Sequence, residues 1–173
     1  MSENKQPLAE SRSEEKKTVK KDAFETAVKY LAVSPRSEKE VREKLYSKGF
    51  HRQEVEDAIE RAKKYRYIDD ESYTADFVDY YAGRYGRKKL EFKLTVEKGI
   101  SPQLAKTVIE DKLSDEAELD KAVETAAKYA KTKRITERKD AKKVAAYLYQ
   151  RGYDGGTISK AMSRVFDVSE FED

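Results

Sequence analysis

The feature that most constrains the fold of this chain is a short motif that occurs three times. Each copy consists of a basic residue, a glycine and a bulky apolar residue, and the glycines recur at a period of about 50 residues. A glycine after a helix-forming stretch commonly ends the helix, because it adopts the left-handed conformation without a steric penalty. The copies therefore predict three equivalent helix ends, at Lys48-Gly49-Phe50, Lys98-Gly99-Ile100 and Arg151-Gly152-Tyr153.

The residues that follow each copy also repeat. Small or apolar side chains stand five, eight and nine residues after each bulky residue, which is the spacing of one face of a helix. Matching patterns at this period are typical of a helical repeat array, and such arrays offer a long surface to a partner rather than a catalytic pocket. The matched positions are Val55, Ala58 and Ile59, then Ala105, Val108 and Ile109, then Ile158, Ala161 and Met162.

The composition fits thin helical layers. Of the 173 residues, 38% are hydrophobic and 41% are charged, which is too polar for one large globular core. The chain also holds 12 tyrosines and 6 phenylalanines, which is too aromatic for a disordered protein. Several small helical units, each hiding its apolar face against neighbours, satisfy both facts.

Helix-start and helix-stop residues divide the chain into nine predicted helices. Ser37 with Glu40 forms a capping box. Ser114 or Asp115 is expected to cap the seventh helix, and Asp115 with Glu118 resembles a second capping box. The third helix is expected to end near Tyr67. The prediction is an all-α chain of three tandem three-helix repeats in an elongated, curved array, with a disordered tail at 1–21, repeats at 22–68, 69–113 and 114–168, and a C-terminal tail at 169–173.

The second repeat is predicted to bury an aromatic stripe. Aromatic residues recur at helical spacing after Asp70, so we expect them to face a core rather than a partner. Tyr85 falls outside this stripe and is the better candidate for a contact. The stripe consists of Tyr73, Phe77, Tyr80 and Tyr81.

The helix that ends at Gly99 departs from the repeat pattern. Thr95 stands four residues before the glycine, where the other repeats have Leu45 and Leu148. The apolar residues that this helix is expected to bury are Leu90, Leu94, Phe92 and Val96.

Few residues could support catalysis. The chain has no cysteine, which excludes disulfides and thiolate chemistry, and its single histidine, His51, follows a helix stop, where a capping or surface role is expected. Asp69, Asp70 and Glu71 could contribute to a metal site, but acids at a helix start also complement the helix dipole. No glycine-rich loop precedes a Lys-Ser or Lys-Thr pair. We therefore expect no enzyme activity, no cofactor and no metal.

No apolar run is long enough to span a membrane, and the charged N-terminus does not resemble a secretory signal, so we expect a cytoplasmic protein. The net charge of +3 permits a nucleic-acid partner without requiring one.

Two basic clusters are the candidate contact surfaces. Basic residues beside tyrosines suit a phosphate backbone or an acidic protein groove. The first cluster surrounds a glycine turn after the tyrosine-rich helix and comprises Arg84, Tyr85, Arg87, Lys88 and Lys89. The second surrounds the turn between the seventh and eighth helices and is either a solvated face or a binding surface; it comprises Lys131, Lys133 and Arg134, with Lys128, Arg138 and Lys139 beside them.

Four strings of residues, in order, resemble the RecX family, and the resemblance covers about residues 24–167. The first repeat carries Ser37-x-x-Glu40-Val41-Arg42-x-Lys44-Leu45-x-x-Lys48-Gly49-Phe50. The link to the second repeat is Tyr67-Ile68-Asp69-Asp70-x-x-Tyr73-x-x-Asp76-Phe77. The second and third repeats carry Gly86-x-x-x-Leu90 with Lys98-Gly99-Ile100, and Tyr147-Leu148-x-x-Arg151-Gly152-Tyr153.

The resemblance implies a regulator of the RecA recombinase. Proteins of this family are tandem three-helix units that lie in the groove of the RecA filament on DNA and inhibit ATP hydrolysis and strand exchange, with no cofactor. We expect this chain to do the same as a monomer, with weak DNA contact at most. The alternative is a helical protein that binds single-stranded or double-stranded DNA without RecA.

Overall fold

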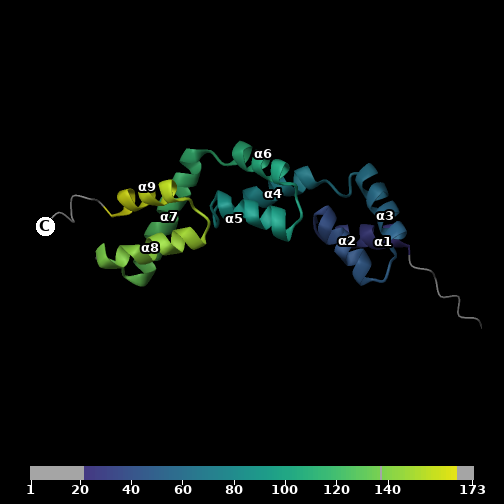
Figure 1. The fold of residues 1–173 in the computed structure, drawn as a ribbon, viewed down its shortest axis with the longest axis horizontal. Coiled ribbons are helices and arrows are strands. Elements are labelled where there is room, and N and C mark those ends of the chain that lie inside the picture. Colours follow the sequence, from purple (N-terminus) through teal and green to yellow (C-terminus); the bar gives the residue numbers. More distant parts are fainter. Residues whose placement is uncertain (1–21, 137, 167–173) are drawn as a thin grey trace, which may run out of the picture.

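The computed structural model describes residues 22–136 and 138–166, which form helices and contain no strand. The helices gather in three groups along an elongated row, and the first and last groups lie at opposite ends (Figure 1). This arrangement confirms the predicted all-α array. The predicted tails at 1–21 and 169–173 lie outside the described residues, as do residues 167–168 at the predicted end of the third repeat.

The first group contains α1 (Ala23–Leu31), α2 (Glu38–Ser47) and α3 (Arg52–Lys64). Ser37 and Glu40 form the predicted capping box at the start of α2. The three helices contact one another around a core of small and branched side chains: Ala23, Ala27, Val41, Leu45, Val55, Ala58, Ile59, Ala62 and Ile68.

The second group contains α4 (Asp70–Tyr81), α5 (Arg87–Phe92), its π-helical continuation η1 (Lys93–Glu97), and α6 (Pro102–Lys112). Its core is separate from the first and comprises Phe77, Val78, Leu90, Leu94, Ile100, Ala105, Ile109 and Leu113.

The third group contains α7 (Asp115–Lys133), α8 (Arg138–Gln150) and α9 (Gly155–Val165). Three alanines of α7, Ala122, Ala126 and Ala130, are buried, whereas Ala127 is exposed. The core of this group also comprises Ile135, Val144, Leu148, Tyr153 and Ala161.

The π-helical turn explains why Thr95 stands where leucine was expected. The N–H of Ile100 donates to the carbonyl of Leu94 (2.9 Å), six residues back. At the other two helix ends the equivalent bonds reach only five residues back, from Phe50 to Leu45 (3.3 Å) and from Tyr153 to Leu148 (3.2 Å). The extra residue in η1 lets Leu94 occupy the buried position, as expected for this helix.

Three expectations, about α3, α4 and α5 with η1, were wrong. Helix α3 ends at Lys64, before Tyr67, because Arg66 adopts a left-handed conformation with φ 56°. Tyr80 is 66% exposed, since it lies off the line of its neighbours Tyr73, Phe77 and Tyr81. Phe92 and Val96 are also exposed, because Leu90 and Leu94 alone fill the inner side of this helix.

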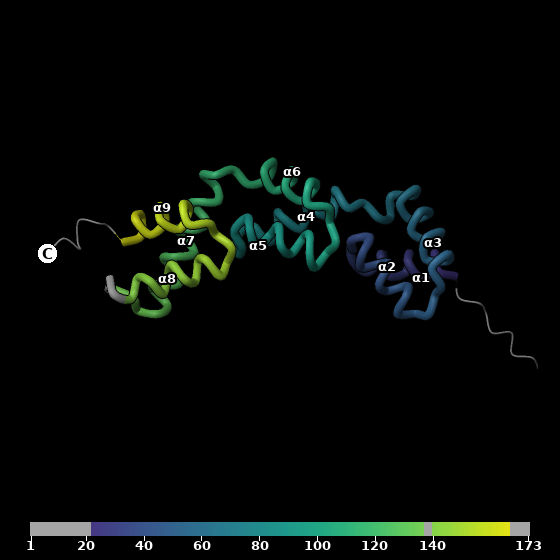
Figure 2. The backbone as a smooth tube through the Cα atoms, viewed as in Figure 1, coloured from purple at the N-terminus to yellow at the C-terminus, as the bar shows by residue number. Residues whose placement is uncertain are grey.

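The three repeats meet at two junctions. At each junction, the start of the second helix of one repeat contacts the end of the second helix of the following repeat. The helices α2, α5 and α8 consequently follow one edge of the backbone trace (Figure 2). At the first junction, Gly99 has φ +71° and lies against the side chain of Lys39. The Lys39 ammonium donates to the carbonyl of Val96 (2.9 Å).

No helix in the described part of the chain is both long enough and apolar enough to cross a membrane.

Candidate partner-binding surface

The second junction, between the start of α5 and the end of α8, determines where the side chains of the first basic cluster lie. The N–H of Gly86 donates to the carbonyl of Arg151 (2.9 Å), and the N–H of Lys88 donates to the carbonyl of Gly152 (3.2 Å). Gly152 has φ +90°, and a Cβ atom there would stand 2.5 Å from the backbone N of Lys89. This close backbone contact places the five clustered residues on three different sides of the junction.

Arg87 lies inside the junction. Its N–H donates to Oε1 of Glu118 (2.8 Å), and its guanidinium donates to Oδ1 of Asp115 (2.5 Å) and to the carbonyl of Leu113. Its buried Nε lies 3.4 Å from Oε2 of Glu118 but makes no hydrogen bond within the described part of the chain. Arg87 therefore ties the second repeat to the third.

Glu118 was predicted to form a capping box with Asp115, and this was wrong. Ser114 caps α7 instead, and the Glu118 side chain, 3% exposed, turns to Arg87. Burial raises the pKa of the Glu118 carboxyl, while the hydrogen bond and the charge of Arg87 act in the opposite direction.

Arg84 and Tyr85 lie on one side of the junction. The Tyr85 ring stacks on Tyr81 (5.7 Å between centroids) and is half-buried against the second core, so it is not outside the aromatic packing as predicted. The Arg84 guanidinium lies 5.6 Å from the centre of the exposed Tyr80 ring. Arg151 reaches the same side, where its Nη1 donates to the carbonyl of Arg84 (3.3 Å).

These groups border a hollow of about 300 Å³ between the end of α4, α7 and α8, which we call the basic hollow. Arg151 is held there by a hydrogen bond from its Nη2 to the Tyr147 hydroxyl (2.5 Å). Glu124 is the one acid in the lining and pairs with Lys128 (2.7 Å). The lining residues are Gly83, Arg84, Glu124, Thr125, Lys128, Tyr129, Thr132, Tyr147 and Arg151.

Lys88 and Lys89 lie on another side, in a hollow of about 510 Å³ shared with Tyr149 and Gln150. The Lys89 ammonium is 5.8 Å from the centre of the Phe92 ring. Sequence reasoning missed Tyr149 and Arg151 as surface residues. The available signal was their position just before Gly152 in the third copy of the glycine motif. At such a helix end, one side of the helix faces the junction and the other side faces solvent.

The second basic cluster lies at the end of α7. Lys131, Lys133 and Arg134 are exposed, and Arg134 ends the helix with φ 53°. Lys128, one turn earlier, connects this helix to the basic hollow. The side chains of Arg138 and Lys139 lie outside the described part.

The acidic residues have structural partners. Asp69 caps α4 by accepting from the N–H of Ser72 (2.9 Å), and Asp70 accepts from the N–H of Glu38 (2.9 Å) across the first junction. His51 is the N-cap residue of α3. Among the described residues, no group of three potential ligands could hold a metal ion.

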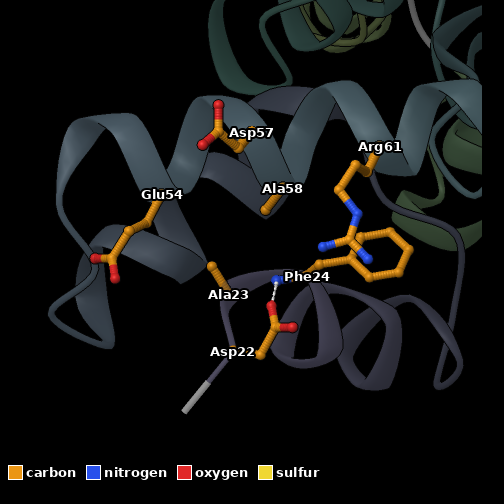
Figure 3. Close-up of a pocket in the computed structure, with 7 residues that line it drawn as sticks. All are labelled: Asp22, Ala23, Phe24, Glu54, Asp57, Ala58 and Arg61. Carbon is orange, nitrogen blue, oxygen red and sulfur yellow. Dashed lines mark hydrogen bonds between the residues drawn. The ribbon is translucent and has the colours of Figure 1, made fainter. Parts of the chain in front are cut away.

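A third hollow, of about 310 Å³, lies between the start of α1 and α3. It contains three acids, but the carboxylates of Asp22, Glu54 and Asp57 point in different directions (Figure 3). Asp22 accepts from the N–H of Phe24 (2.8 Å), whose ring lies 4.0 Å from the Arg61 guanidinium.

The chain is similar to RecX proteins in sequence and in fold. Residues 23–61 match the first three-helix domain of RecX, and residues 116–162 match the third. A regulatory protein RecX of Clostridium beijerinckii is 32% identical over 155 residues, which cover 85% of this chain and 70% of that protein. Another, from Clostridium botulinum Eklund 17B, is 34% identical over 154 residues, covering 86% and 70%.

A solved structure supports the same fold. The crystal structure of RecX from Lactobacillus salivarius superposes with a TM-score of 0.74 at 23% identity, covering 83% of this chain and 94% of that one. The matched domains and the two clostridial relatives together assign this chain to the RecX family.

Proposed function

We propose that this chain regulates homologous recombination and DNA repair in the cytoplasm by binding the RecA filament and inhibiting its ATPase and strand-exchange activities. The observation that carries the proposal is membership of a family whose clostridial members are named regulatory protein RecX. The partner itself follows from the family resemblance, and the elongated array is suited to it.

Length and rigidity favour a filament as the partner. The α7 helix has 19 residues and is therefore about 28 Å long, and two further helical groups continue the row. Because hydrogen bonds join the groups at both junctions, the array can contact neighbouring subunits at once. Such bridging disfavours subunit addition or the active ATP-bound state. Catalysis by this chain is not part of the proposal.

The test is DNA-dependent ATP hydrolysis by the cognate RecA while this protein is titrated from far below RecA's concentration. Strong inhibition at a small molar fraction supports capping or destabilisation of the filament, and inhibition only near equal ratios supports occupancy along the groove. Unchanged ATP hydrolysis at every ratio contradicts the proposal.

A second candidate function is direct DNA binding without RecA. The basic hollow favours it, because two arginines, a lysine and several hydroxyls line one depression between tyrosines. Phosphate contacts of this kind make affinity fall steeply with salt. Salt-sensitive binding to bare single-stranded DNA, together with unchanged RecA activity, would favour this candidate.

A further inference from the structure

Three large apolar side chains are exposed on α5, on its continuation η1 and at the end of α8. Phe92 and Val96 are four residues apart, so they lie on the same side of α5 and η1, and they are 49% and 56% exposed. Tyr149 of α8 is 70% exposed. Single exposed apolar residues are ordinary, but a group of them on adjoining elements is typical of an interaction site.

Phe92 adjoins the hollow that Tyr149 lines, and Val96 lies one turn beyond Phe92, toward the first junction. Tyr149, Lys88 and Lys89 line the hollow of about 510 Å³, and the Lys89 ammonium connects that hollow to the Phe92 ring. We call Lys88, Lys89, Phe92, Val96 and Tyr149 the anchor face. The backbone hydrogen bond from Lys88 to Gly152 fixes α5 against the end of α8 beneath it. A surface fixed in advance loses little freedom when a partner binds.

The charge of the anchor face is one-sided. Its hollow is lined by Lys88, Lys89, Tyr149, Gln150, Gly152 and Tyr153, with no acid. Neither lysine forms an ion pair with a carboxylate in the described part of the chain, although most other lysines of the second repeat do, as with Lys93–Glu97 and Lys112–Asp79. Lys88 acts on Asp154 without an ion pair: the backbone hydrogen bond from Thr157 and, in addition, the charge of Lys88 lower the pKa of that carboxyl. Because neither ammonium is held in an ion pair, both can reach carboxylates of another molecule.

The apolar chemistry favours a protein over a nucleic acid. Val96 offers a base no ring on which to stack, and the Lys89 ammonium lies near the Phe92 ring, where a base would stack. Aromatic anchors at the centre with charges at the rim are instead the usual composition of a protein interface. We propose that the anchor face docks a protein segment that places carboxylates against Lys88 and Lys89 and an apolar side chain between Phe92 and Tyr149.

This inference rests on the proposed function, because the segment would belong to the RecA filament. The anchor face and the basic hollow can be tested separately. Tyr147 and Arg151, which border the basic hollow, lie one helical turn apart on α8. Tyr149 lies between them in sequence and so points about 200° around the helix from Tyr147.

The experiment measures binding of the fluorescently labelled full chain to RecA filaments on single-stranded DNA, by anisotropy at two salt concentrations. We expect Phe92→Ala and Tyr149→Ala each to raise Kd about tenfold, as loss of a central aromatic anchor does. The double variant Lys88→Glu, Lys89→Glu should raise Kd by a similar factor and flatten its salt dependence. The matched controls are Tyr65→Ala, an exposed tyrosine of the first repeat, and the double variant Lys64→Glu, Lys160→Glu, which should change Kd less than about twofold.

Circular dichroism and thermal melting of every variant establish that the helices are retained. If the wild-type chain binds and inhibits but the anchor-face variants behave like the controls, the inference is wrong and the proposed function stands. If the wild-type chain does not bind the filament at all, the proposed function is wrong as well. If the anchor-face variants lose binding to bare DNA, the ligand of the anchor face is DNA and not a protein segment. If they lose a self-association that sedimentation detects in the wild type, the ligand is a second copy of this chain.

Discussion

The buried carboxylate of Glu118 accepts a hydrogen bond from the backbone N–H of Arg87, with 2.8 Å between Oε1 and N. The bond satisfies the first free N–H of α5 with an acid from α7, so a helix of the second repeat is capped by the third repeat. Asp70 does the same for Glu38 at the first junction. Each junction thus completes a helix start that its own repeat leaves open.

Removing this cap should weaken the second junction. We expect Glu118→Ala to lower the free energy of unfolding by about 2 kcal/mol, because it leaves the part-buried Arg87 N–H without an acceptor and removes the carboxylate beside the guanidinium. Glu118→Gln should cost less, since its amide oxygen can still accept. Urea denaturation measures both, with Glu116→Ala, at an exposed position of the same helix, as the control. Equal stability of the Glu118→Ala and Glu116→Ala variants would contradict the assignment.

The same carboxyl predicts a pH dependence. Burial raises the pKa of Glu118 above its ordinary value of 4.5, so the folded chain holds this proton more tightly than the unfolded chain does. Stability contributed by this group is therefore present at low pH and is lost as the pH rises through the raised pKa. We expect the stability of wild type relative to Glu118→Gln to fall as the pH rises from 4.5 through the raised pKa of Glu118. A constant difference across denaturation curves in that range would exclude the effect.

Gly49 and Gly152 offer a matched pair of substitutions. Both have left-handed φ angles, +86° and +90°, but a Cβ at Gly49 meets nothing within 4 Å, whereas one at Gly152 meets the backbone N of Lys89 at 2.5 Å. We expect Gly49→Ala to cost about 1 kcal/mol of strain, and Gly152→Ala about 3 kcal/mol because the repeats must also separate. Denaturation gives the stabilities, and small-angle scattering should show a changed shape for Gly152→Ala alone.

The sequence predicts the repeat architecture well because its signals are local. A glycine needs only its own left-handed conformation to end a helix, and Ser37 needs only Glu40 to cap one. The candidate surface was harder to predict because it depends on a long-range contact. Arg84, Arg87 and Lys88 are neighbours in sequence, and only the packing of Gly152 against α5 sends them to three sides of the junction.

The π-helical turn was unpredictable for a different reason. Helix periodicity assumes a constant number of residues per turn, so it indicates that Leu94 is buried but not that the helix takes one extra residue before Gly99. We expect Leu94→Ala to lower the free energy of unfolding by about 3 kcal/mol, the usual cost of emptying a buried leucine position. Thr95→Ala should cost less than about 1 kcal/mol, because Thr95 loses only a bond from its Oγ1 to the carbonyl of Glu91. Urea denaturation compares them, and the reverse order of costs would mean that Thr95 is the buried residue.

The basic hollow predicts a DNA affinity that can be separated from filament binding. We expect the chain alone to bind single-stranded DNA weakly, with log K falling as salt rises, because Arg84, Lys128 and Arg151 line one depression. Replacing Arg84 and Lys128 with glutamine should lower the slope of log K against log salt by about 0.7 for each phosphate that the variant no longer neutralises. Arg151 is kept, since its guanidinium also donates to the Arg84 carbonyl and thereby supports the fold. Glutamine at the exposed positions Arg52 and Lys64 is the matched control, and a slope that changes equally in both variants would mean that DNA binding is spread over the surface rather than held in the hollow.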